Sequence, residues 1–326
     1  MTKRERVMAA LRGAPVDRVP VSLWLHNFAT ENSADTLAAE TLRLAHRFDW
    51  DFLKPQSRAQ CFAEMWGLRY APSHERETPY TVTRAPLATA EDLRRLEPAD
   101  ARTGSLGEQL QALQAIRKAV GAETPIIWTV FSPLMVLPFL LAGGRATALA
   151  LMRSELAAVD HALGAMAVTL GAYARAAVAE GADGLFYATN MATRELSTAA
   201  ECRRFQRPHD LRILGHVESA PFNVLHVCGA DILFDEFADY PATVLSWATV
   251  PGNPSLADVH RRTGRAVLGG LPAKPVIAGL PPAEVVDRGR RAIAEMGGRF
   301  LLLGPDCSID PSTPDAVMDA ASAATR

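Results

Sequence analysis

The sequence predicts an α/β fold, a (β/α)8 TIM barrel formed by one domain over residues 1–326 with an N-terminal helical extension. Short runs of β-branched and apolar residues alternate with longer runs rich in Ala, Leu, Arg and Glu. Repeated strand–helix units of this kind form a parallel sheet with helices outside it. Eight strand-like runs favour a closed barrel over an open sheet, and 326 residues is an ordinary length for such a barrel.

The elements are expected in the following order. A helix over Arg4–Arg12 precedes the first strand. Strands are expected at Val19–Leu25, Phe52–Pro55, Ile126–Phe131, Gly184–Ala188, Asn223–Val227, Val244–Trp247, Ala266–Leu271 and Phe300–Leu303. Helices are expected at Ser33–Arg47, Leu106–Val120, Ala146–Glu180, Thr198–Ser219, Ile232–Ala238, Leu256–Thr263, Pro282–Met296 and Pro314–Ala324. Tyr70–Pro86 has few helix formers and is expected to form a hairpin or an extended excursion.

One stretch, Thr124–Gly144, carries no charge and is long enough for a membrane helix. Pro125, Pro133 and Pro138 argue against that, because each removes a backbone donor. A buried strand, a loop and a short apolar helix are expected instead. The N-terminal residues mix acidic and basic side chains and have no apolar run typical of a signal peptide. The protein is therefore expected in the cytoplasm and not in a membrane.

Composition narrows the classes of partner. Hydrophobic residues make up 48% and charged residues 21%, which is typical of a packed globular protein. The net charge of −2 gives no general attraction to nucleic acid or to an anionic membrane. The four cysteines are too few for a disulfide scaffold, so metal or thiol chemistry is the better interpretation of their positions.

One histidine and two of the cysteines suggest a metal site. His226 and Cys228 lie two apart at the end of a predicted strand, so both side chains point to the same side if the strand continues. Cys307 follows another predicted strand, and barrel enzymes place their chemistry at the carboxyl ends of strands. One imidazole and two thiolates suit zinc. The alternative is that a buried His and two Cys residues only pack in the core.

Three protein ligands leave one zinc position open, which is the catalytic and not the structural arrangement. A substrate thiol bound at that position would have a lowered pKa and would act as a thiolate nucleophile at neutral pH.

Other residues are expected around the same mouth of the barrel. His26 is a candidate general acid, fourth metal ligand or polar contact, or simply a histidine hydrogen-bonded at the start of a loop. We expect His26 and Tyr187 to be catalytic. Candidate substrate contacts are Asn27, Lys54, Asn190 and Trp247. For Tyr187 and Trp247 the alternative is ordinary core packing. Asp306 could orient a ligand, or could be a turn residue after Pro305.

The chain resembles the uroporphyrinogen decarboxylase superfamily of (β/α)8 barrels over nearly its whole length. The similar segments are Arg4–Val21, the H-V-C-G run at His226–Gly229 and the G-P-D-C-S-I-D-P-S-T-P run at Gly304–Pro314. Within the superfamily it looks like the zinc-dependent, cobalamin-linked methyltransferase branch, whose H-x-C and distant Cys correspond to His226, Cys228 and Cys307. The resemblance implies methyl transfer between a corrinoid and a small acceptor, often a thiol activated on zinc.

The sequence also departs from the decarboxylases of this superfamily. The segment after their first strand holds an anionic porphyrinogen with arginines, whereas Trp24–Asn32 contains none. Their G-N-x-D-P motif reads G-G-L-P-A at Gly269–Ala273. The nearest approach to a corrinoid motif, Asp258–Gly264, has one residue too many, so methylcobalamin is expected to arrive free or on a separate corrinoid protein.

The leading hypothesis is therefore a zinc-dependent methyl- or alkyltransferase that uses a small thiol or a similar nucleophile. The alternatives are a decarboxylase or lyase of the parent family, and a non-catalytic barrel with a structural zinc or a bound small ligand. A small-molecule substrate and a separate corrinoid protein are the expected partners. A homodimer is left open, and neither nucleic acid nor a membrane is expected.

Overall fold

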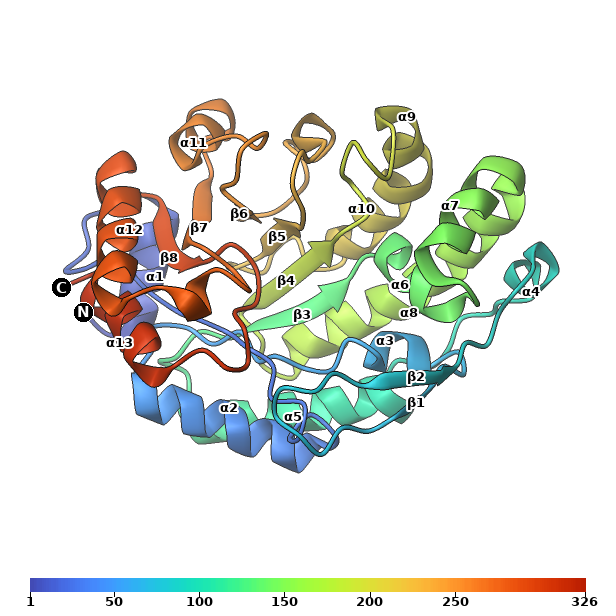
Figure 1. Ribbon diagram of the computed structural model, residues 1–326, viewed down its shortest axis with the longest axis horizontal. Coiled ribbons are helices and arrows are strands. Elements are labelled where there is room, and N and C mark those ends of the chain that lie inside the picture. The colour runs from blue at the N-terminus through green and yellow to red at the C-terminus, as the bar shows by residue number, and fades with distance from the viewer.

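A computed structural model describes residues 1–326 and contains six parallel strands that follow one another in chain order (Figure 1). The strands are β3 (Ile127–Phe131), β4 (Gly184–Thr189), β5 (Val224–Val227), β6 (Val244–Trp247), β7 (Ala266–Leu271) and β8 (Leu301–Pro305). Parallel neighbours require a crossover after each strand, and these crossovers place the connecting segments outside the sheet. All residues of β3 are buried, as expected for a strand that is covered on both faces.

The two segments predicted as the first strands, Val19–Leu25 and Phe52–Pro55, form isolated bridges and not ladders. The first segment has two such bridges, at Val21 and Leu25, and the second has one, at Leu53. In the first, Pro20 O accepts from Leu303 N of β8 at 2.8 Å. Asp51 N donates to Val21 O at 2.9 Å, and Leu53 bridges to the start of β3. Pro20 has no N–H to donate, which limits the ladder there. Hydrogen bonds thus connect β8 to β3 through these two segments, which we call the first (Val19–Leu25) and second (Phe52–Pro55) closing segments. The fold is the predicted α/β barrel with two irregular strands.

Helices surround the strands in Figure 1. They are α1 (Lys3–Leu11), α2 (Ala34–Phe48), α3 (Cys61–Glu64), α4 (Ala90–Arg94), α5 (Gly104–Val120), α6 (Pro133–Leu140), α7 (Gly144–Ser154), α8 (Leu156–Ala179), α9 (Ala199–Glu201), α10 (Arg207–Gly215), α11 (Leu256–Thr263), α12 (Pro282–Glu295) and α13 (Asp315–Ala323). The predicted N-terminal helix is α1, which begins with a capping box between Thr2 and Glu5. Ser255 caps α11 as predicted, because its side chain accepts from Asp258 N.

Three predicted helices differ from the structure. The helix predicted over Ala146–Glu180 is divided into α7 and α8 at Glu155, whose φ of −127° and ψ of 51° are not helical. The helix predicted over Thr198–Ser219 contains a π-helical turn at Cys202–Gln206, just before Pro208, which cannot donate to a helical hydrogen bond. Only a 3-10 turn, Phe234–Glu236, forms within the predicted helix Ile232–Ala238.

The predicted excursion is an antiparallel hairpin of β1 (Arg69–Ala71) and β2 (Thr81–Arg84). Tyr80 of this excursion donates from its hydroxyl to Phe28 O at 3.0 Å. Arg76 donates to Pro311 O at 2.9 Å. The excursion therefore contacts both the loop that follows the first closing segment and the loop that follows β8, and its hydrogen bonds hold these two loops in place.

A buried carboxylate ties the N-terminal helix to the closing segments. The Asp51 side chain is fully buried and accepts from Arg6 (2.7 Å), from Arg18 (2.6 Å) and from Val21 N (2.8 Å). Charge-assisted hydrogen bonds of this kind are stronger than neutral ones. Asp51 therefore joins α1, the first closing segment and the second.

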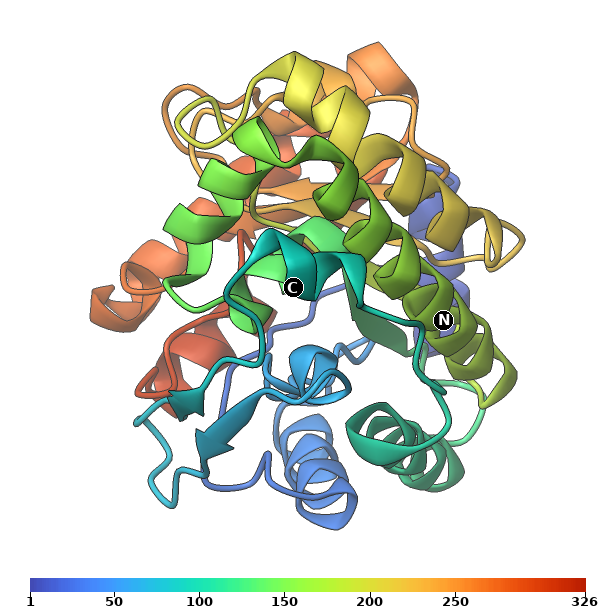
Figure 2. The same ribbon diagram turned by 90° about the vertical axis from the view of Figure 1, so that its right-hand side faces the viewer.

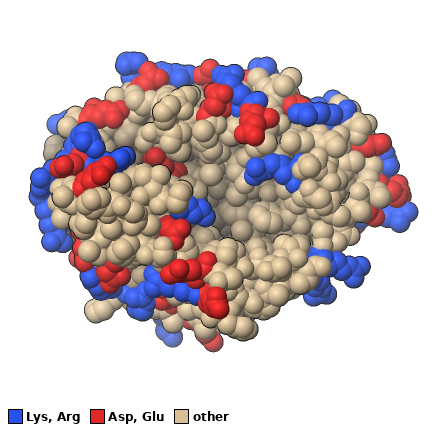
Figure 3. All heavy atoms as spheres, in the orientation of Figure 1, with Lys and Arg blue, Asp and Glu red and all other residues tan.

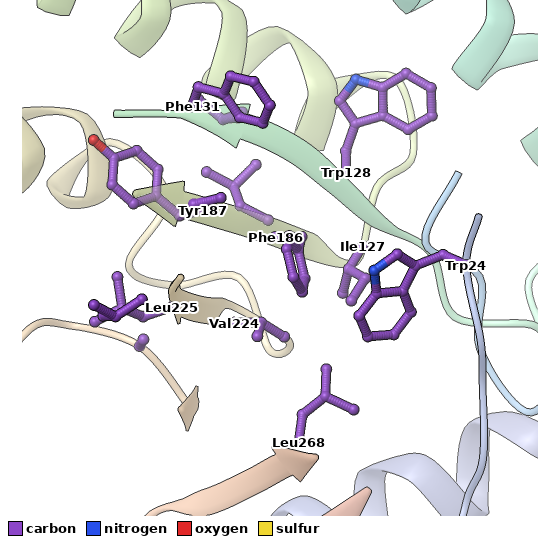
Figure 4. Close-up of a cluster of buried hydrophobic side chains, with 14 of the residues drawn as sticks. Trp24, Ile127, Trp128, Phe131, Phe186, Tyr187, Val224, Leu225 and Leu268 are labelled. Atoms are coloured by element: carbon purple, nitrogen blue, oxygen red, sulfur yellow. The ribbon is translucent and has the colours of Figure 1, made fainter. Parts of the chain in front are cut away.

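The hydrophobic core is one continuous cluster of 92 buried residues. Figure 4 shows Trp24, Ile127, Phe186 and Leu268 facing a common space inside the barrel. One helix, α8, is long and apolar enough to cross a membrane by length and composition alone, but 67% of its most apolar 18 residues are buried. In Figure 2, α8 runs diagonally across the face turned to the viewer.

Candidate metal centre

Three side chains converge at the carboxyl ends of two strands. His226 lies in β5, Cys228 directly after it, and Cys307 two residues beyond β8. The two sulfur atoms are 3.8 Å apart, and the ligand atoms of all three residues lie within 4.8 Å of one another. The structure therefore brings together the three residues predicted as metal ligands. Figure 3 shows the surface hollowed near its centre, over the region where Figure 1 shows β4 and β5.

The His226 imidazole is held so that one nitrogen remains free. Its Nδ1 lies 3.1 Å from Ser246 Oγ, and Ser246 is the register partner of His226 across β5 and β6. Its Nε2 is buried without a hydrogen-bond partner in the protein. The Phe186 ring stacks on the imidazole at 5.0 Å between centroids. With the proton on Nδ1 donated to Ser246, the Nε2 lone pair is available to a metal ion.

The two cysteines share their protons unequally. The pKa of Cys307 is well below that of an ordinary thiol, because Cys228 donates a hydrogen bond to it, with a further contribution from His226. The same hydrogen bond raises the pKa of Cys228 well above its usual value. Two thiolates at this distance repel each other, so both cysteines ionise readily only when a cation lies between them.

Ser246 is a functional candidate that the sequence analysis missed. Ser246→Ala is expected to weaken zinc binding about tenfold to a hundredfold, because the imidazole loses the partner that fixes its orientation and tautomer. Competition with a chromophoric chelator measures this affinity. Ser22→Ala is the matched control, because Ser22 is also a buried serine but its hydroxyl has no hydrogen-bond partner. Equal affinity in Ser246→Ala and the wild type would remove this role.

Lys54 and Asn190 lie close to the cluster by position in the barrel. Lys54 is 6% exposed, and its Nζ lies 4.9 Å from the centroid of the Phe186 ring that packs on His226. Burial lowers the pKa of Lys54 to about 7. Asn190 follows β4, and its buried Oδ1 has no hydrogen-bond partner in the protein. Both therefore present polar groups that the fold leaves unsatisfied or only partly satisfied.

His26 and Asn27 are engaged elsewhere. His26 Nδ1 lies 2.8 Å from Glu31 Oε1, and its Nε2 lies 2.9 Å from Gln56 Nε2. Both ring nitrogens are thus occupied, which corrects the expectation that His26 is a direct acid or a metal ligand and agrees with the polar-contact alternative. Asn27 donates from its amide to Glu40 at 3.0 Å.

Tyr187 and Trp247 face away from the cluster. Ala188 is the register partner of His226 in β4, so the neighbouring Tyr187 points to the opposite side of the strand. Figure 4 shows Tyr187 and Phe186 leaving β4 in different directions. The Tyr187 hydroxyl donates to Asp210 of α10. Trp247 is 1% exposed and donates to Pro254 O at 2.9 Å. These placements correct the expectation that both residues line the mouth.

The partner of Tyr187 gives a pH-dependent prediction. Burial raises the pKa of the Asp210 carboxyl from its ordinary value of 3.8 to about 6, although the hydroxyl groups of Tyr187 and Ser132 donate to it and favour the carboxylate. The folded state therefore holds this proton more tightly than the unfolded state. The resulting stability is full below the unfolded pKa and is lost as pH rises through about 6.

Relative to Asp210→Asn, the wild type is expected to lose about 2 kcal/mol of unfolding free energy between about pH 4.5 and about pH 7.5. Urea unfolding of both proteins at the two pH values measures this difference. A constant difference between the two proteins would show that Asp210 does not titrate in this range.

Asp306 is buried beside Cys307 but does not contact the ligands through its carboxylate. It accepts from Thr249 N at 2.9 Å and from the Thr249 hydroxyl at 3.0 Å, which links the loop after β6 to the loop that carries Cys307. Asp306 also lines a cavity of about 640 Å³ next to α12.

These features define an α/β barrel with a three-residue soft-ligand cluster at the carboxyl ends of its strands. The chain matches the family model described as Uroporphyrinogen decarboxylase (URO-D) over residues 2–326, and it belongs to this family. The predicted superfamily is thus confirmed.

Relatives with assigned names are methyltransferases. The chain is 26% identical to the methylcobamide:CoM methyltransferase MtaA of Methanosarcina barkeri, over 96% of this chain and 94% of the relative. It is 23% identical to the methylcobamide:CoM methyltransferase MtbA of Methanosarcina acetivorans, over 97% and 95% of the two chains. A solved methyltransferase from Methanosarcina mazei has the same fold, with a TM-score of 0.85, 22% identity and coverage of 99% and 98%. The resemblance to the methyltransferase branch is confirmed.

Proposed function

We propose that this protein is a zinc-dependent methyltransferase that exchanges a methyl group between a corrinoid and a small thiol or a similar nucleophile. The observation that carries the proposal is the convergence of His226, Cys228 and Cys307 at the mouth of the barrel. The names of the relatives supply the reaction class and the corrinoid.

The donor geometry fits zinc. Zinc–sulfur bonds of about 2.3 Å at a tetrahedral angle place two sulfurs about 3.8 Å apart, and Cys228 and Cys307 have that spacing. His226 Nε2 is buried and lacks a partner, which is costly unless a ligand satisfies it. The soft set of one nitrogen and two sulfurs favours zinc over magnesium or calcium.

Zinc bound there would lower the pKa of a thiol in its open position and so favour the thiolate. The residues of the chain have separate tasks. Ser246 orients the His226 ring and Phe186 packs against its face. Lys54 and Asn190 present polar atoms to the substrate. Methyl transfer to the thiol forms a carbon–sulfur bond and breaks the carbon–cobalt bond, the electron pair stays on the corrinoid, and the thiol proton is released.

The corrinoid is proposed to bind from outside, either free or on a separate protein, because the chain carries no corrinoid motif. A cytoplasmic location fits this exchange with a soluble donor. No arginine occurs in Trp24–Asn32 to hold a porphyrinogen, and this segment argues against decarboxylation of that substrate.

Metal removal and return test the proposal. Dialysis against a chelator is expected to leave a folded protein that no longer demethylates methylcobalamin in the presence of a panel of thiols, followed by the cobalamin absorbance. Added zinc is expected to restore the rate. A barrel that unfolds when zinc leaves would instead indicate a structural metal. A zinc-loaded protein inactive with every thiol and with other nucleophiles would contradict the transferase.

A further inference from the structure

The amine of Lys54 occupies an unusual position for a lysine. It extends from the second closing segment into the barrel, with Nζ 4.9 Å from the Phe186 ring centroid and 5.8 Å from that of Trp24. Phe186 in turn stacks on the His226 imidazole. Lysine is seldom this deeply buried, and no carboxylate forms a hydrogen bond or an ion pair with this amine. Its hydrogen-bond partner in the protein is Gln56.

A chain of hydrogen bonds with a fixed direction continues from Gln56. An amine hydrogen can be accepted by Gln56 only at Oε1, so the amide nitrogen faces His26 and donates to Nε2 at 2.9 Å. The imidazole must then carry its proton on Nδ1 and donate to Glu31 at 2.8 Å. Glu31 is 1% exposed. Each group in the chain thus fixes the orientation of the next.

At its Lys54 end, this chain of hydrogen bonds leaves N–H groups without an acceptor. A lysine side chain carries three N–H groups as the ammonium and two as the neutral amine. Gln56 accepts one of them, so at least one N–H remains in either state. A buried donor without an acceptor is destabilising, and an oxygen atom of a ligand would satisfy it.

We infer that Lys54 holds an oxygen acceptor of the substrate beside the three-residue cluster, and that Gln56, His26 and Glu31 are positioning residues that act through Lys54. The inference deepens the proposed function and rests on it for the identity of the substrates. The acceptor is either an acidic or carbonyl oxygen of the methyl acceptor or a carboxamide oxygen at the edge of the corrin ring.

The first experiment does not depend on methyl transfer. Metal-free protein is labelled with isotopic formaldehyde and a borane reductant, and each lysine is followed by mass spectrometry. Lys3 and Lys118 report on general unfolding. His26→Leu and Gln56→Leu are expected to change the labelling rate of Lys54 several-fold while leaving the rates of Lys3 and Lys118 unchanged, because the amine loses its fixed partner.

The conservative variant His26→Gln provides the rescue. Its side-chain oxygen can accept from Gln56 where Nε2 does, so its Lys54 rate is expected to stay close to that of the wild type. If Lys54 reacts identically in His26→Leu, His26→Gln and the wild type, the positioning chain is refuted whatever the protein catalyses.

Steady-state kinetics identify the ligand. Lys54→Met keeps an unbranched side chain, one atom shorter than that of lysine, and removes its donors. It is expected to raise KM about tenfold for either the thiol or methylcobalamin, depending on which carries the acceptor oxygen. His26→Leu should raise the same KM and His26→Gln should not. Unchanged KM values for both substrates in Lys54→Met would overturn the contact, even in an active enzyme.

Discussion

Cys307→Ser is expected to abolish stoichiometric zinc binding and methyl transfer while leaving the barrel folded. Cys307 supplies one of the two sulfurs, and serine is a poor ligand for zinc beside a thiolate and an imidazole. The wild type is expected to hold about one zinc per chain and the variant less than about a tenth of that. Elemental analysis after gel filtration measures the metal, and circular dichroism checks the fold.

The matched control is Cys202→Ala. Cys202 is also a buried free cysteine, but it lies in the π-helical turn and not at the barrel mouth. Its replacement is expected to leave the zinc content at the wild-type level. If Cys307→Ser retained full zinc content, or if Cys202→Ala lost the metal equally, the assignment of the ligands would fail.

Asp51→Ala is expected to destabilise the protein by about 3–5 kcal/mol, because it leaves Arg18 without its carboxylate partner and leaves Arg6 paired with Asp17 alone. Arg6 and Arg18 both pair with Asp51, and Val21 N also donates to it. The loss of stability affects the two closing segments, which pair with their neighbours through isolated bridges and not through ladders. Urea unfolding of the metal-free protein measures the effect without a contribution from zinc.

Asp239→Ala is the control for a surface ion pair. Asp239 pairs with Arg207 on the surface, and such pairs contribute about 0–1 kcal/mol. A cost of Asp51→Ala no larger than that of Asp239→Ala would show that the closing segments do not depend on this carboxylate.

The sequence predicted the strand–helix alternation because buried parallel strands need continuous apolar runs, and the strands β3 to β8 have them. It did not predict that Val19–Leu25 and Phe52–Pro55 form isolated bridges in place of ladders, because ladder length depends on the spacing of neighbouring strands in space. Pro208 was a signal for the interrupted helix before α10. Glu155, where α7 ends, carries no comparable signal.

For the site, the sequence predicted that His226, Cys228 and Cys307 meet, because each lies at or just after the end of a predicted strand. The sequence could not predict whether Tyr187 and Trp247 face into the barrel or away from it, because the side to which a residue points depends on the register between strands. Each lies next to a residue that faces into the barrel, so a shift of one position reverses its role.

Two kinds of residue were missed for different reasons. Ser246 could have been found as a single hydroxyl within the apolar strand V-L-S-W. Gln56 and Glu31 lie in loops, where polar residues are ordinary, and their connection through His26 exists only after folding.

X-ray absorption spectroscopy at the zinc edge of the purified protein shows which atoms of the chain hold the metal. A first shell with two sulfur atoms at about 2.3 Å and at least one imidazole nitrogen at about 2.0–2.1 Å is predicted. A shell made only of oxygen and nitrogen, or the absence of stoichiometric zinc, would contradict the account.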